Sequence, residues 1–255
     1  MSSMRRLTFA VSLAAALAPA TRALAQWPPE TLTNLQVLDP ATPPAEVIAA
    51  MRSFTSALGV RCQYCHVYSG DDPDDLTAFE FASDERPAKT KARAMLRMVR
   101  TINEELLPEA DGELGLRVEC ETCHRGREHP ETLVHLLERE LEQNGLEPTI
   151  AHYRELRAEL YGSGAFDFTA GSLDRVARHA LHAGQADRAL ALTDLNLEFH
   201  PDEEFTNLLR AETLLALDRR AEAQLQYQRV LELAPDNAFA AQRLTELTTD
   251  PPEDP

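Results

Sequence analysis

The sequence has 255 residues, which is enough for one large domain or two small ones, each with its own core. It holds 42 acidic residues against 25 basic ones, and its formal net charge is −17. So acidic a surface argues against nucleic acid or anionic lipid as the main partner. A protein with a basic docking face fits better.

The start of the chain has the pattern of a secretory signal peptide, predicted over residues 1–25. Two arginines precede an apolar, alanine-rich stretch over residues 7–20, and residues 23–25 (Ala-Leu-Ala) supply the small-x-small pattern of a cleavage site. The apolar stretch is shorter than a typical membrane span, although an uncleaved anchor helix is the alternative. The sequence therefore predicts export to the periplasm and a mature chain that begins at Gln26.

The first predicted helix begins at Pro43-Pro44, runs to about Leu58 and ends at Gly59. Its apolar face follows the i, i+3, i+4, i+7 rule and comprises Val47, Ile48, Met51, Phe54, Thr55 and Leu58. Beyond it, the glycine- and aspartate-rich segment over residues 70–75 predicts a solvated turn or loop.

A second helix is predicted from about Asp84 to Leu107, where Pro108 ends it. Its apolar stripe comprises Met95, Met98, Val99, Ile102 and Leu106. The other face is basic and carries Lys89, Lys91, Arg93, Arg97 and Arg100. Such a face is either solvated or paired with acidic groups, of a cofactor or of an acidic partner.

All four cysteines of the chain fall in two copies of the pattern C-x-x-C-H. The residues of the two copies are Cys62, Cys65 and His66, and Cys120, Cys123 and His124. Two disulfides or a zinc ribbon would use the cysteines, but neither explains why a histidine follows each second cysteine. C-x-x-C-H is the attachment pattern of c-type haem. We therefore expect two covalently bound haem c groups, each with its iron ligated by the histidine of its motif.

Methionines on the two helices are candidates for the other axial position of each iron. Met51 lies eleven positions before Cys62, and Met98 lies twenty-two positions before Cys120. Methionine on an apolar face is usually a core residue, and Met95 is the alternative ligand on the second helix. A sixth protein ligand would leave an electron carrier, whereas an open position would allow peroxide chemistry.

The run from Met51 to His66 (MRSFTSALGVRCQYCH) resembles the photosynthetic reaction-centre cytochrome c subunit family. So do three shorter segments, Phe81-Ala-Ser-Asp, Lys91-Ala-Arg and Met95-Leu-Arg-Met98. The resemblance covers about residues 32–128. It implies units of helix, turn and C-x-x-C-H in which a helix methionine ligates iron, and so it implies Met51 and Met98 as sixth ligands. Members of that family usually hold four haems, whereas this sequence provides for two.

The last part of the chain contains an internal repeat. Ala189 matches Ala223, and Pro201 matches Pro235, each thirty-four positions further on. This resembles tetratricopeptide repeats, which have that period and in which each unit is a pair of helices. The expected helices span about residues 172–183, 186–199, 203–217, 220–233 and 237–248. Two more charged helices are predicted before them, over residues 131–144 and 148–161.

These observations predict a mainly α-helical chain. Its dihaem cytochrome c domain of helix, turn and C-x-x-C-H spans residues 26–130, a helical linker spans 131–170, and tetratricopeptide-like repeats span 171–250. We expect electron transfer between a donor and an acceptor redox protein without an enzymatic reaction, and docking to a membrane redox complex through the repeats. The first alternative is a dihaem peroxidase, for which the spare histidines are His129, His135 and His152. The second is a docking scaffold in which the haems act as a redox sensor.

Overall fold

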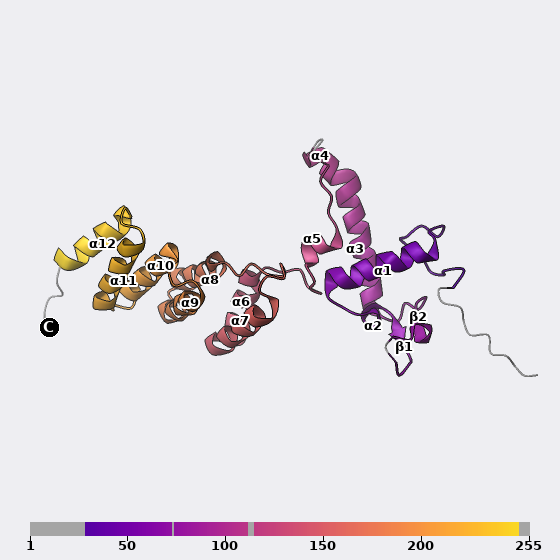
Figure 1. The fold of residues 1–255 in the computed structure, drawn as a ribbon, viewed down its shortest axis with the longest axis horizontal. Coiled ribbons are helices and arrows are strands. Elements are labelled where there is room, and N and C mark those ends of the chain that lie inside the picture. The colour runs from indigo at the N-terminus through magenta and orange to yellow at the C-terminus, as the bar shows by residue number, and fades with distance from the viewer. Residues whose placement is uncertain (1–28, 73, 112–114, 250–255) are drawn as a thin grey trace, which may run out of the picture. The chain divides into compact units, whose positions relative to one another are not determined.

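The computed structural model describes residues 29–72, 74–111 and 115–249 (Figure 1). The predicted signal peptide lies outside these residues. The chain divides into two compact units, one made of residues up to Ala50 with Gln63–Ala94, the other of Met51–Cys62 with all residues from Met95 on. Within the described ranges, no helix is both long and apolar enough to cross a membrane.

Residues 29–130, called here the motif region, contain short elements around two longer helices. In chain order these are α1 (Pro44–Leu58), α2 (Cys62–Cys65), β1 (Val67–Tyr68), a 3-10 helix (Leu76–Ala78), β2 (Phe79–Glu80), α3 (Pro87–Thr101), a π-helical segment (Ile102–Leu106), α4 (Leu107–Asp111) and α5 (Cys120–His124). The first long helix therefore has the predicted bounds and both C-x-x-C motifs lie on short helices, whereas the second long helix begins at Pro87 rather than at about Asp84.

Helix α1 ends where the sequence predicts, and it does so by a glycine cap. Gly59 has φ +66°, the left-handed region that glycine adopts without strain. Its amide donates to the carbonyl of Ser56 at 3.2 Å, and the Val60 amide donates to the carbonyl of Thr55 at 3.0 Å. This pair of bonds is the Schellman arrangement. It turns the chain so that α2 and its first cysteine follow within three residues.

The segment after the first motif forms a small hairpin that the sequence does not predict. Strands β1 and β2 pair antiparallel, with Val67 opposite Glu80. The loop between them contains the predicted turn residues, and Asp75 caps the 3-10 helix by accepting from the Thr77 amide at 2.9 Å. With two residues per strand, the alternation that identifies a strand in a sequence is too short to detect.

The expected end of the second long helix before Pro108 is wrong. Helix α3 passes through the π-helical segment directly into α4, which contains Pro108. In the π-helical segment the Leu107 amide donates to the carbonyl of Ile102, five residues back. Such a bulge shifts the hydrogen-bond register, so a proline that lacks an N–H can follow without breaking the helix.

The described residues from 131 to 249, called here the C-terminal region, form consecutive helices (Figure 1). From α8 on each packs beside the next, while α8 itself packs against α6, and α7 packs against α6 and α9. They are α6 (Leu133–Gln143), α7 (Leu146–Leu160), α8 (Ala170–His182), α9 (Ala186–Phe199), α10 (Glu204–Ala216), α11 (Arg220–Leu233) and α12 (Ala238–Thr249). Every helix predicted here is present, with ends that differ by at most two residues. Helices α8 to α11 form two successive pairs, as the period of the repeat requires.

The C-terminal region has two hydrophobic cores of its own. One cluster extends from Leu133 to Leu209 and joins α6 and α7 to the first helix pair, and the other lies among α10, α11 and α12. A buried polar network also crosses between helices: the Asn196 side-chain amide donates to Asp174 at 2.9 Å, and the Thr206 hydroxyl donates to it at 2.8 Å. Burial raises the pKa of Asp174. Helices α8, α9 and α10 are thereby joined by polar as well as apolar contacts.

Burial differs sharply between the motif region and the C-terminal region. In the described part of residues 29–130, the buried apolar side chains are Val47, Ala57 and Phe79, and helix α3 buries none of its residues. The hydrophobic cores begin at Leu133. The motif region therefore has little protein core of its own.

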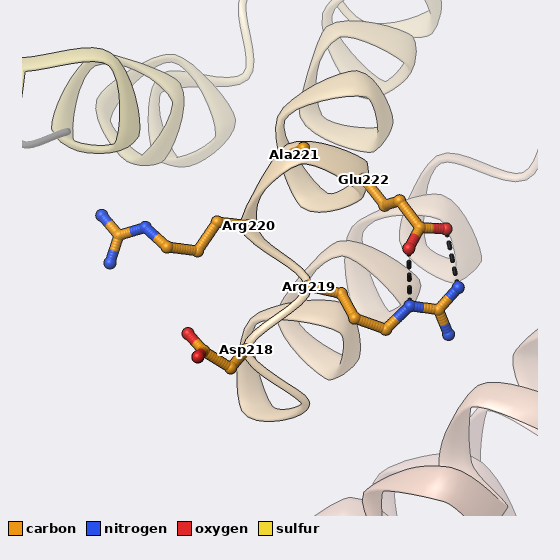
Figure 2. Close-up of a pocket in the computed structure, with 5 residues that line it drawn as sticks. All are labelled: Asp218, Arg219, Arg220, Ala221 and Glu222. Atoms are coloured by element: carbon orange, nitrogen blue, oxygen red, sulfur yellow. Dashed lines mark hydrogen bonds and ion pairs between the residues drawn. The ribbon is translucent and has the colours of Figure 1, made fainter. Parts of the chain in front are cut away.

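A surface pocket lies at the turn between α10 and α11, lined by residues 218–222 (Figure 2). Arg219 donates two hydrogen bonds to the Glu222 carboxylate, at 2.6 and 2.7 Å, while Arg220 points away from this pair. An exposed pair of this kind contributes little to stability, and its charges already satisfy each other. The pocket lies in the repeats and contains none of the predicted site residues.

The small residues of the repeat provide a test of its packing. Ala223 is fully buried in α11, in the cluster formed by α10, α11 and α12, so Ala223→Leu should overpack that core and lower the free energy of unfolding by about 1–3 kcal/mol. Ala221 is exposed on the same helix, and Ala221→Leu is the matched control. Thermal unfolding of the two variants measures the difference. Equal stability of both would contradict the helix pairing described here.

Candidate haem-attachment sites

The first motif forms one helical turn. Cys62 and Cys65 are the first and last residues of α2, and a spacing of three residues places both side chains on one face of a helix. His66 follows at the end of the turn and is buried, with 8% of its surface exposed. The motif thus presents two thiols and an imidazole from a single short segment, as covalent haem attachment requires.

The surroundings of His66 keep its imidazole neutral. Its ring lies 4.9 Å from that of Phe81, edge to face. Burial, assisted by the charge of Lys89, lowers the pKa of His66 to about 4. The neutral imidazole is the form that ligates metal ions. Its Nδ1 atom is buried and has no hydrogen-bond partner in the described part of the chain, which is costly for a polar atom unless a ligand satisfies it.

A group of ion pairs fixes the segment that leads into α3. Lys89 Nζ lies 3.0 Å from Asp84, and Arg93 Nη1 lies 2.9 Å from the same carboxylate. The Arg93 guanidinium, followed by the Asn34 amide, holds the pKa of Asp84 well below its usual range. Lys89 also donates to the carbonyl of Phe81 at 2.8 Å, beside His66. Lys89 and Arg93, both predicted on the basic face of this helix, are therefore paired within the chain.

The second motif forms helix α5, which has a capping box at its start. The Glu119 side chain accepts from the Thr122 amide, and the Thr122 hydroxyl accepts from the Glu119 amide at 3.0 Å. At the end of the helix, His124 Nδ1 lies 2.8 Å from the carbonyl oxygen of Arg127. If Nδ1 carries the proton and donates to that carbonyl, Nε2 is left as the basic nitrogen, which is the usual arrangement of a metal-ligating histidine.

The side-chain amide of Asn103, which the sequence does not identify as a site residue, positions the segment that leads into this motif. Asn103 donates to the carbonyl of Val118 at 2.8 Å and accepts from the Val118 amide, also at 2.8 Å. Asn103 lies in the π-helical segment, and Val118 lies two residues before Cys120. The Asn103 side chain thus makes two hydrogen bonds to the backbone of Val118, as a neighbouring strand would, and joins the π-helical segment to the residues before Cys120. An asparagine inside a predicted helix carries no signal for such a contact with a residue fifteen positions away.

The turn over residues 125–127 connects the second motif to the end of helix α1. Arg125 and Gly126 both have positive φ, at 50° and 78°. The Gly126 amide donates to the carbonyl of Ala57, near the end of α1, at 2.8 Å. A Cβ atom on Gly59 would lie 2.1 Å from the Gly126 carbonyl oxygen. Gly59 is therefore required for close approach of two backbones, in addition to its role as the cap predicted from the sequence.

The predicted methionine ligands lie on α1 and α3. Met51 is half-buried on α1, whereas Met98 and Met95 are 49% and 48% exposed on α3, one turn apart. Equal exposure does not distinguish Met98 from Met95, so Met98 stays a prediction. The large exposed apolar side chains of this part of the chain are Met95, Met98, Leu106 and Leu116.

The residues present fit a covalently bound haem. Each motif supplies two thiols on one short helix and a histidine at the end of that helix, and the neighbouring part of the chain exposes apolar side chains that a porphyrin face would cover. No disulfide joins any of the four cysteines, all of which are described, and the described residues contain no cluster of three or more histidine, cysteine or acidic side chains that could hold a metal ion.

Among the described residues, none of the spare histidines belongs to a cluster that could hold a metal ion. His129 is exposed and 3.3 Å from Glu128, its neighbour in the chain, and His135 is exposed on α6. His152 forms a 2.7 Å contact with Glu140 between α6 and α7. His129 lies in a bend before α6, and His135 and His152 lie on α6 and α7.

Comparison with known proteins gives a family match and one curated relative. Residues 12–149 match the family described as photosynthetic reaction centre cytochrome C subunit. Cytochrome c-554 of Chloroflexus aurantiacus is 41% identical over 106 residues, which cover 41% of this chain and 23% of that protein. The match thus spans less than a quarter of the length of this relative.

Solved structures similar to the chain contain tetratricopeptide repeats. The first repeat domain of Spaghetti (RPAP3), bound to an HSP90 peptide, is 20% identical and matches 46% of this chain and 90% of its own, with a TM-score of 0.33. The first such domain of human RPAP3 is 18% identical and matches 46% and 91% of the two chains, also with a TM-score of 0.33.

The contact of Gly59 with Gly126 yields a test of how the second motif is joined to the end of α1. Gly59→Ala should be destabilising, because its Cβ would collide with a backbone oxygen. Gly115→Ala is the matched control, since Gly115 has φ +67° but a Cβ there would meet no atom within 4 Å. Both variants incur the strain of a left-handed alanine, about 1–2 kcal/mol. The collision should cost Gly59→Ala about 1–3 kcal/mol more. Denaturant unfolding of the holoprotein measures both, and equal losses would refute the contact.

Proposed function

The chain belongs to the photosynthetic reaction centre cytochrome c subunit family, and on that premise we propose that it is a periplasmic dihaem c-type cytochrome that carries electrons between two redox proteins. Membership of this family implies covalently bound haem. The count of two haems, the residues that hold them and the location are the parts we propose here.

The observation that carries the proposal is the combination of two C-x-x-C-H turns with a motif region that buries almost no apolar side chains. Cys62 and Cys65 would hold one haem, and Cys120 and Cys123 the other, each through two thioether bonds. His66 and His124 would ligate the irons. A bound haem iron supplies a reversible one-electron couple whose potential depends on its axial ligands.

The protein side chains decide whether such a site carries electrons or reacts with a substrate. We propose Met51 and Met98 as the sixth ligands, because each lies on the apolar face of a long helix that precedes a motif. A protein ligand on both sides of the iron excludes small molecules from it. The exposed, acidic surface would then act only in docking, where charge steers association with a basic partner.

The proposed location depends on the predicted signal peptide, and the proposed partners depend on the C-terminal region. The predicted signal peptide over residues 1–25 supports export. The C-terminal region has its own cores and stacked helix pairs, and such stacks commonly offer binding surfaces. We propose that it docks the cytochrome to a membrane or periplasmic redox complex.

Haem attachment should depend on the four thiols. Cys62→Ala with Cys65→Ala should leave one haem per chain, and the quadruple variant that adds Cys120→Ala and Cys123→Ala should leave none, because no other cysteine can form a thioether. Haem staining after denaturing electrophoresis, with the mass of the intact chain, gives the count. Gln63→Ala, within the first motif, should keep two haems. Covalent haem in the quadruple variant would refute the assignment.

The axial ligands are tested by replacing methionine. Met51→Ala or Met98→Ala should open one iron, produce a high-spin signal and lower the potential of that haem, because thioether ligation raises the potential. Met95→Ala is the matched control for Met98, with the same helix and the same exposure. Optical and electron paramagnetic resonance spectra measure both effects. A change in Met95→Ala alone would make Met95 the ligand. No change in any variant would point to a histidine.

A further inference from the structure

The 125–127 turn contacts the C-terminal region as well as the second motif. The Arg127 guanidinium lies over the ring of Phe166, 4.0 Å from its centroid. The backbone carbonyl of the same arginine lies 2.8 Å from His124 Nδ1. Arg127 therefore touches both the histidine of the second motif, through its backbone, and the aromatic ring, through its side chain.

Phe166 is held in place by the core of the C-terminal region. It is 7% exposed and belongs to the cluster formed by α6 to α9. Its ring is edge to face with that of Phe168, at 6.1 Å. Phe168 is fixed in turn, because its carbonyl accepts from Arg157 at 2.9 Å and its ring contacts Tyr153 at 5.9 Å. The position of the Phe166 ring under Arg127 is thus determined by packing within the C-terminal region.

Stacking is the main contact that orients the Arg127 side chain. Its Nε atom is buried and has no hydrogen-bond partner among the described residues. Its contact with Glu131 is long, at 3.9 Å, and Glu131 also binds Arg139. A desolvated guanidinium over an aromatic ring is a favourable arrangement of this side chain. Phe166 therefore restrains Arg127, and through it the position of the carbonyl that His124 uses.

We propose that Arg127 is a positioning residue through which the C-terminal core sets the reduction potential of the second haem. The inference rests on the proposed function, in which His124 ligates iron. When the ring nitrogen that does not bind iron donates a hydrogen bond, a ligating histidine becomes more basic. A more basic ligand favours ferric iron, so a well-held Arg127 carbonyl keeps the potential of the second haem lower. His66 has its own surroundings around Phe81, so the first haem should be independent of Phe166.

The experiment is a redox titration of the two-haem protein carrying Phe166→Leu, which removes the aromatic ring without changing charge. The potential of the second haem should rise and that of the first should stay unchanged. The second haem is identified as the one retained in Cys62→Ala with Cys65→Ala. Arg127→Lys keeps the charge but cannot stack as a planar group, and it should shift the same potential in the same direction.

Phe199→Leu is the matched control. Phe199 packs on the same core and also lies under an arginine, since the Arg157 guanidinium is 4.4 Å from its ring centroid. This variant should loosen the same core but leave the ring under Arg127 in place, so it should shift the potential of the second haem less than Phe166→Leu does.

Three results would overturn the inference. If the potential of the second haem is unchanged in both Phe166→Leu and Arg127→Lys, with two haems still bound, this inference is wrong and the proposed function is unaffected. An equal shift in Phe199→Leu would replace it by general loosening of the core. Absence of haem on Cys120 and Cys123 in the unaltered protein would overturn the proposed function as well, so haem counting separates the two failures.

Discussion

Helices of the motif region need apolar surface to pack against, and their own side chains do not provide it. An amphipathic helix is stable in a protein because its apolar face is removed from water, at roughly 25 cal/mol per Å². Helix α3 buries none of its residues, and the large apolar side chains near the second motif are exposed. Under the proposed function, the covalently bound haems would supply the missing surface. On this account the cofactor is a structural component as well as a redox centre.

Hydrogen bonds rather than apolar packing join the segments around the second motif. The carbonyl of Ala57 accepts from Gly126, and Gly59 provides the space for that approach. The Asn103 amide performs a similar function for the segment before Cys120. Contacts of this kind specify position without a hydrophobic core. The C-terminal region is built in the opposite way, from interlocking apolar side chains, and the 125–127 turn links it to the second motif.

The features that the sequence predicts correctly are those encoded by local patterns. Apolar periodicity locates the long helices, and the repeat identifies Ala189 and Ala223, both of which are fully buried. The features that it misses depend on contacts between distant residues. Pro108 is a reliable helix terminator only where the hydrogen-bond register is regular, and the π-helical segment removes that condition. The Gly59–Gly126 contact and the Arg127–Phe166 stack join segments far apart in the chain, for which a single sequence has no signal.

Amide hydrogen exchange of the protein with and without haem tests the central claim most directly. The apoprotein is obtained by expressing the chain without its predicted signal peptide. The account predicts that amides of α1 and α3 are protected in the holoprotein and exchange rapidly in the apoprotein, because their packing partner is the porphyrin. Amides of α8 to α11 should be protected in both, since that core is complete without it. Protection of α1 and α3 in the apoprotein, equal to that in the holoprotein, would contradict the account.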